Sequence, residues 1–127
     1  MQWTNATFKT RCGMSQEFKN EIDLSVSKGM ISEAKRGLAW REEHGRGATQ
    51  VGATRARQII RNEGLSERTW KRVYSFFSRH EVDKQAEGFS PGEKGYPSNG
   101  RIAWACWGGD AGFARAKKIV GQLDKED

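Results

Sequence analysis

The chain has 127 residues, of which 35% are hydrophobic and 30% are charged. This length suits one domain with a modest core, and we expect a single domain over 1–127. No apolar run approaches the length of a membrane span, and no secretory signal opens the chain, so we expect no membrane partner. The two cysteines, Cys12 and Cys106, lie far apart in the sequence, which favours a reduced, intracellular protein.

The positive charge of the chain is concentrated in one segment. Overall, 22 basic and 16 acidic residues give a net charge of +6. Segment 46–79 alone has eight basic and two acidic residues, also +6, so the remainder balances at 14 of each. A local cationic excess indicates an anionic partner, most often nucleic acid. The alternative is a basic surface that only keeps the protein soluble.

The N-terminal part predicts an arm followed by two helices. Residues 1–14 show no clear periodicity and are assigned to the arm. Apolar residues at four-residue spacing predict a first helix that starts at Ser15 and stops by Gly29. A second helix is expected from an N-cap at Ser32 to about Glu43.

Segment 46–79 predicts two helices joined by a glycine turn. Thr49 and Ser66 are suitable N-caps, and Gly64 suits a left-handed turn between the helices. The second helix is basic and rich in hydroxyl side chains away from its aromatic stripe. This combination is typical of a helix-turn-helix, although similar helical hairpins occur in all-α scaffolds that bind no nucleic acid.

The C-terminal part predicts a long loop and a second helical hairpin. Residues 80–99 contain both prolines and dense charge, which is typical of a functional or disordered loop. An apolar helix is expected over 101–107, ended by two glycines, and a last helix over 110–123 with Asp110 as its N-cap. The sequence therefore predicts a mainly α fold, a compact bundle of about five helices with a 100–123 hairpin.

Three motifs carry a resemblance to a known group of proteins. They are RHEVDK at 79–84, PGEKGYP at 91–97 and WGGD at 107–110. Together with the surrounding residues 34–120, they resemble a domain recurrent in tailed-phage proteins. That domain occurs beside head-maturation proteases and as small standalone proteins. The resemblance implies a bacteriophage origin, with the protein in the host cytoplasm or the virion, and it transfers no protease activity.

No catalytic or cofactor motif is recognisable. His80, Glu81 and Asp83 are candidate metal ligands, but they show no metal-ligand spacing, so a structural role is the stronger interpretation. The carboxylates follow no nuclease spacing, and the glycine-rich pieces do not match a phosphate-binding loop. Trp70, Trp104 and Trp107 are expected in the core, which leaves Trp3 and Trp40 as candidates for stacking on bases. We therefore expect no enzyme activity and no cofactor, and the weaker alternative is a metal-dependent hydrolase that uses His80 and nearby acids.

The leading hypothesis is a non-enzymatic nucleic-acid-binding protein, with DNA favoured over RNA. The alternative is a protein-interaction module in phage head assembly or host takeover, in which the basic hairpin meets an acidic protein. In both cases the predicted binding residues are the cations of the hairpin and a second pair near the C-terminus: Arg46, Arg55, Arg57, Arg61, Arg68, Lys71, Arg72, Arg79, Lys117 and Lys118.

Overall fold

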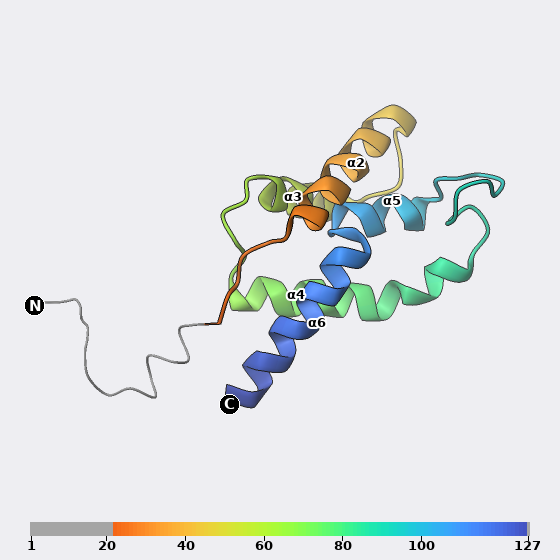
Figure 1. The fold of residues 1–127 in the computed structure, drawn as a ribbon. Helices are drawn as coiled ribbons and strands as arrows, with labels where there is room; N and C mark the ends of the chain where they lie inside the picture. The colour runs from red at the N-terminus through yellow and green to blue at the C-terminus, as the bar shows by residue number, and fades with distance from the viewer. Residues whose placement is uncertain (1–21, 127) are drawn as a thin grey trace, which may run out of the picture.

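A computed structural model describes residues 22–126, which fold into five α-helices and one 3-10 helix (Figure 1). No strand occurs within this range, so the prediction of a mainly α bundle is confirmed. The predicted arm, residues 15–21 of the first predicted helix and Trp3 lie outside the described residues. The elements in chain order are α2 (Lys28–His44), α3 (Gln50–Ile60), α4 (Glu67–His80), η1 (Glu81–Gln85), α5 (Asn99–Cys106) and α6 (Gly109–Glu126).

Four helices begin at a hydroxyl N-cap. The side chains of Ser27, Thr49, Ser66 and Ser98 accept hydrogen bonds from backbone N–H groups of the first turns of α2, α3, α4 and α5. Each bond satisfies a donor that has no partner within its helix. The N-caps predicted at Thr49 and Ser66 are confirmed.

The predicted start of the second helix is wrong. Ser27 is the N-cap of α2, and Ser32 lies inside the helix. The preceding residues 23–27 are not helical, although a helix was predicted there. Asp23 accepts from the Ser25 N–H at 2.9 Å, a local bond that competes with helix formation. The Leu24 carbonyl accepts from the Trp70 indole at 2.8 Å, so a distant element also holds this segment in place.

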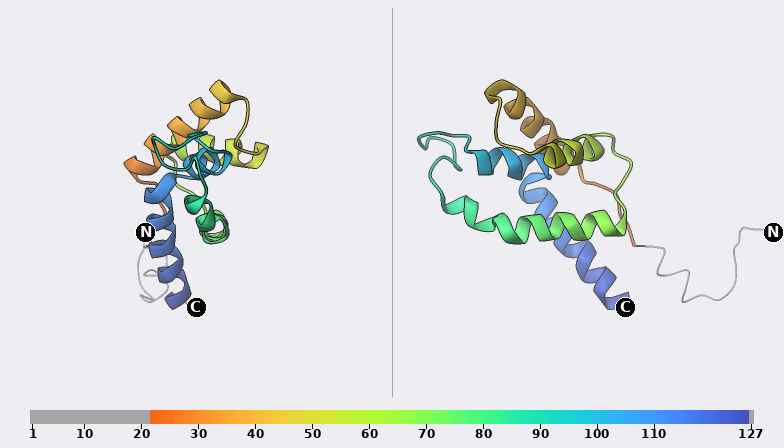
Figure 2. Two further views of the ribbon diagram at one scale, coloured as in Figure 1. Left: turned by 90° about the vertical axis from the view of Figure 1, so that its right-hand side faces the viewer. Right: turned by 180° about the vertical axis from the view of Figure 1, so that it is seen from behind.

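The helices pack in two groups that share one core. Helix α2 packs on α3, α5 and α6, whereas α4 packs mainly on α6 (Figures 1 and 2). Helices α3 and α4 make little direct contact, so the basic segment is not a tightly packed helical hairpin. The largest fully buried side chains include Trp70, Trp104 and Phe77. Phe77 lies at 4.7 Å from Trp104 and 5.2 Å from Phe113, measured between ring centroids.

The long loop is ordered against the core. Its first part forms η1, and turns follow from residue 86 to 98. The Glu93 carboxylate accepts from the N–H groups of Gly88 and Ser90, both at 3.0 Å. Phe89 is buried with its ring 5.9 Å from Trp104, and Tyr96 packs edge-on against Trp40 at 5.6 Å. Two aromatic anchors thus hold the loop beside α2 and α5.

The junction between α5 and α6 differs from the prediction at one residue. Gly108 and Gly109 have φ values of 117° and 67°, the left-handed region that glycine enters without strain. The predicted break is therefore present. Asp110, however, is not the N-cap: it lies within the first turn of α6, and its carboxylate accepts from the Trp104 indole. Helix α6 therefore begins at Gly109, directly after the turn, and one residue before the predicted N-cap.

Candidate functional site

One face of α4 carries the cations of the basic segment. The helix buries Trp70, Val73, Phe76 and Phe77 against the core. Polar side chains recur three or four residues apart on another face, as helical geometry requires for residues that share a side. These residues are Arg68, Lys71, Arg72, Ser75 and Arg79.

Helix α3 and the α5–α6 junction complete a groove with this face of α4. The groove has a volume of about 590 Å³. Val51 and Arg55 line it from α3, and Trp107 lines it from the junction. We call this the cationic groove. Its lining comprises Val51, Arg55, Arg68, Lys71, Arg72, Ser75, Arg79 and Trp107.

Arg55 is the buried cation of the groove. Only 7% of its surface is exposed, because its guanidinium lies over the Trp107 ring at 5.1 Å. One terminal nitrogen donates to the Gln58 side chain at 2.5 Å, and the buried Nε has no hydrogen-bond partner within residues 22–126. Burial, together with the charge of Arg72, lowers the pKa of Arg55. The site therefore holds a charge that is poorly compensated.

Trp107 supports Arg55 from the core side of the fold. Its ring stacks on Phe76 at 4.4 Å between centroids, with the ring planes only 7° apart. Phe76 is itself buried in α4. A rigid aromatic pair therefore fixes the position of the guanidinium, and the cation–π contact offsets part of the cost of burying it.

Residues 22–126 contribute no acidic side chain to the lining of the groove. None of its lining residues is Asp or Glu. Among residues 22–126, ion pairs join Arg36, Arg61, His80, Lys84, Arg101 and Arg115 to carboxylates, and none of the groove cations takes part in one. Five positive side chains thus share one concave surface, which concentrates their electrostatic potential.

The structure brings together five of the ten predicted binding residues. Arg55, Arg68, Lys71, Arg72 and Arg79 line the cationic groove, and the other five do not. Arg46 donates to the Asn99 side chain at 2.6 Å, and Arg61 lies 3.8 Å from Glu63. The remaining three are exposed elsewhere, one on α3 and two on α6: Arg57, Lys117 and Lys118.

Three lining residues were missing from the predicted set. Ser75 could have been found, because it lies seven residues after Arg68 and therefore on the same helical face. Trp107 was correctly predicted to be buried, and 8% of its surface is exposed. Its contact with the Arg55 guanidinium could not be predicted, because that contact depends on where α3 packs. Val51 is 58% exposed, and its contribution likewise follows from the tertiary structure alone.

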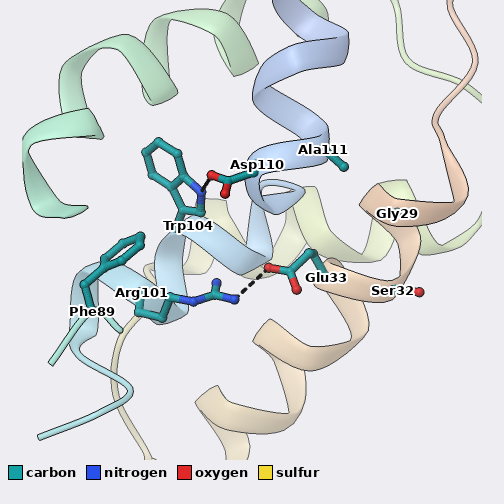
Figure 3. A pocket seen from close by; sticks show the side chains of 8 residues that line it. All are labelled: Gly29, Ser32, Glu33, Phe89, Arg101, Trp104, Asp110 and Ala111. Carbon is teal, nitrogen blue, oxygen red and sulfur yellow. Dashed lines mark hydrogen bonds and ion pairs between the residues drawn. The ribbon is translucent and has the colours of Figure 1, made fainter. Parts of the chain in front are cut away.

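A second cavity, of about 430 Å³, lies among α2, α5 and α6 (Figure 3). Arg101 pairs with Glu33 at 3.0 Å on one side of it, and the Trp104 indole donates to Asp110 at 3.0 Å on the other. Asp110 also pairs with Lys84 at 2.9 Å. Because its charges are paired internally, this cavity attracts an ionic ligand less strongly than the cationic groove.

Trp40 and two of the candidate metal ligands, His80 and Asp83, have partners within the fold. Trp40 packs against Tyr96 and lies under the guanidinium of Arg101 at 5.0 Å, so it is occupied within the fold. His80 Nδ1 lies 3.2 Å from an Asp83 oxygen. Within residues 22–126, no group of three or more His, Cys, Asp or Glu side chains is arranged to hold a metal ion. The contact between His80 and Asp83 joins the end of α4 to η1.

Comparisons with protein-family models, with curated proteins and with solved structures found no match. None of the helices between residues 22 and 126 combines the length and the apolar character needed to cross a membrane.

Proposed function

We propose that this protein is a non-enzymatic nucleic-acid-binding protein and that the cationic groove holds the phosphate backbone. The observation that supports the proposal is the set of five groove cations without an acidic lining residue or an ion pair among residues 22–126. Such a surface favours a polyanion, because each phosphate contact releases counterions condensed on the nucleic acid. The resemblance to tailed-phage proteins leads us to expect this role in an infected cell or in the virion.

The groove supports backbone binding more than base recognition. Its charged side chains are Arg and Lys, which bind phosphate oxygens, and Arg68, Lys71 and Arg72 are exposed on α4. Trp107 is buried beneath Arg55 and is thereby unsuited to stacking on a base. We therefore expect weak sequence preference, and duplex DNA is our first candidate ligand.

Fluorescence anisotropy at low salt tests this proposal. Labelled duplex DNA, single-stranded DNA and RNA are each titrated with the wild type and with Arg68→Gln/Arg72→Gln. The matched control is Lys28→Gln/Lys35→Gln, which removes two exposed charges from α2, a helix that contributes no residue to the groove lining. We expect at least tenfold weaker binding for the groove variant only. The absence of binding to all three ligands would refute the proposal.

An acidic protein segment is the second candidate partner. Val51, which is 58% exposed, adds an apolar element to the cationic wall, and this combination is common at protein interfaces. Affinity capture from lysate of infected cells, with and without nuclease, separates the two candidates. A partner that survives nuclease and depends on Arg68 and Arg72 would favour the protein ligand.

A further inference from the structure

Arg55 lacks the partner that a buried charge normally has. Only 7% of its surface is exposed, yet its guanidinium donates to the neutral Gln58 amide and not to a carboxylate. No carboxylate of residues 22–126 lies within ion-pair distance of it. Burying a charge without a counter-charge is unfavourable, because the charge loses its hydration and gains no ion pair in return. The folded chain therefore carries a local destabilisation at this position.

The neighbours of Arg55 increase this cost. Arg72 reaches the groove from α4, and its positive charge contributes to the lowered pKa of Arg55. Ser75 lies one helical turn after Lys71 on the same wall and supplies a hydroxyl group. The two guanidinium groups and the hydroxyl all supply donors, and the acceptor that Arg55 uses among residues 22–126 is the neutral Gln58 amide. A tetrahedral oxyanion supplies several acceptors and up to two negative charges, and guanidinium groups bind it in bidentate geometry.

We propose that the cationic groove contains a discrete site for one phosphate group, formed by Arg55, Arg72 and Ser75, and that its occupancy stabilises the fold. This inference deepens the proposed function and rests on it for the source of the phosphate, which would be the nucleic-acid backbone. The other cations, Arg68, Lys71 and Arg79, then contact neighbouring phosphates along the groove.

The proposal predicts opposite effects of one substitution on stability and on binding. Arg55→Met keeps an unbranched side chain of similar length over Trp107 and removes the charge. Without phosphate, its melting temperature should equal or exceed that of the wild type, because a poorly paired buried charge is gone. With phosphate, the wild type should gain stability through binding, and Arg55→Met should not.

Thermal unfolding in chloride and in inorganic phosphate, at equal ionic strength, provides the first readout. Phosphate also stabilises proteins by exclusion from their surface, so the comparison is between variants in the same buffer. The control is Lys35→Met, which removes an exposed charge on α2. On transfer from chloride to phosphate, the melting temperatures of the wild type and of Lys35→Met should rise by several degrees more than that of Arg55→Met. Equal increases in all three proteins would overturn the proposal.

Calorimetric titration with inorganic phosphate provides the second readout. The dissociation constant should be at least tenfold higher for Arg55→Met than for Lys35→Met. Should Arg55→Met fail to fold, Arg72→Gln replaces it, because Arg72 is exposed and its loss leaves the core intact. A phosphate affinity unchanged by Arg72→Gln would then count against the site.

Competition with a labelled oligonucleotide separates this inference from the proposed function. If inorganic phosphate displaces the oligonucleotide from the wild type but not from Arg72→Gln, the result would support both the discrete phosphate site and nucleic-acid binding. Phosphate binding without oligonucleotide binding would keep the site, assign it to a free phosphate compound and refute the proposed function. Oligonucleotide binding without any phosphate-dependent stabilisation would refute the discrete site and leave the proposed function in place.

Discussion

Asp110 shows how single side chains join separate elements of this fold. Its carboxylate, at the start of α6, accepts from the Trp104 indole of α5 and from Lys84 of η1. Burial disfavours the charged form, but the hydrogen bonds from Lys84 and Trp104 and the charges of Lys84 and Arg101 outweigh it and lower the pKa of Asp110. The carboxylate therefore stabilises the fold in its ionised form.

Asp110→Asn tests this role. Because the side chain is 74% exposed, solvent screens the ion pair, and we expect a loss of about 0.5–1 kcal/mol at pH 7. The pKa is lower in the folded chain, so the contribution is complete above the ordinary value of 3.8 and disappears as pH falls through the folded pKa. Urea unfolding at pH 7 and below pH 4 measures the difference. A loss that is equally large in acid would contradict this account.

Local side-chain chemistry was predictable from sequence, whereas partners distant in sequence were not. The N-caps at Thr49 and Ser66 depend on donors only three residues away, and both predictions are correct. Asp110 resembles an N-cap by the same local rule, yet its main partners are Trp104 and Lys84. Their proximity results from tertiary packing, which a local pattern does not contain.

Helix α2 packs closely on α5 at Gly37. A Cβ atom at Gly37 would lie 2.6 Å from the backbone nitrogen of Cys106 and 2.8 Å from its Sγ. Such distances are too short for any side chain, so the absence of a Cβ allows the two helices to pack together. Since Gly37 is buried in the middle of α2, its role is packing and not helix termination.

Gly37→Ala should therefore destabilise the protein, by about 1–3 kcal/mol, because the helices must separate to make room. Gly121→Ala is the control, since Gly121 lies exposed in α6 with no atom within 4 Å of its Cβ position. This control should stabilise the protein by about 0.5–1 kcal/mol through helix propensity. Denaturant unfolding of both variants gives the comparison. A Gly37→Ala protein as stable as the wild type would show that α2 and α5 pack less closely.

The sequence pattern predicted which segments form helices, but the start of α2 could not be predicted without the tertiary structure. Apolar spacing predicted α3, α4 and α6, and an apolar run predicted the short helix α5. The same spacing in residues 22–26 predicted a helix that does not form there. The Leu24 carbonyl instead accepts from Leu65 and Trp70, and these tertiary bonds override the local pattern.

At the scale of the whole molecule, one core unites the five α-helices of residues 22–126, and Cys106 reports on its integrity. The core extends from Val26 to Leu123. Burial raises the pKa of the Cys106 thiol to about 11, against a smaller opposing effect of Arg41. At pH 8 the reactive thiolate is thus scarce in the folded chain.

Thiol modification should consequently require unfolding. In a Cys12→Ser background, Cys106 should react with a chromogenic disulfide reagent far more slowly in native buffer than in urea. Substitutions that destabilise the core, such as Gly37→Ala, should accelerate the native reaction in proportion to the open population. Rapid stoichiometric modification of the native protein would contradict the burial of Cys106.

The cationic groove itself is a property of the whole fold. Sequence identified the charged segment and the cationic face of α4, because both are encoded within short stretches. It could not show that α3 and α4 are separated, with Trp107 between them and Arg55 buried over its ring. Nor could it show that Arg46, Arg57 and Arg61 lie outside the groove, since that depends on how α3 packs.

The most direct test of the cationic groove is the salt dependence of duplex DNA binding. Association constants are measured over a range of salt concentrations for the wild type, Arg68→Gln/Arg72→Gln and Lys28→Gln/Lys35→Gln. We predict that the groove variant lowers the slope of log K against log salt by about 2, since each phosphate contact contributes about 0.9. The control should keep the wild-type slope. Equal slopes for the groove variant and the wild type would contradict a phosphate backbone in the groove.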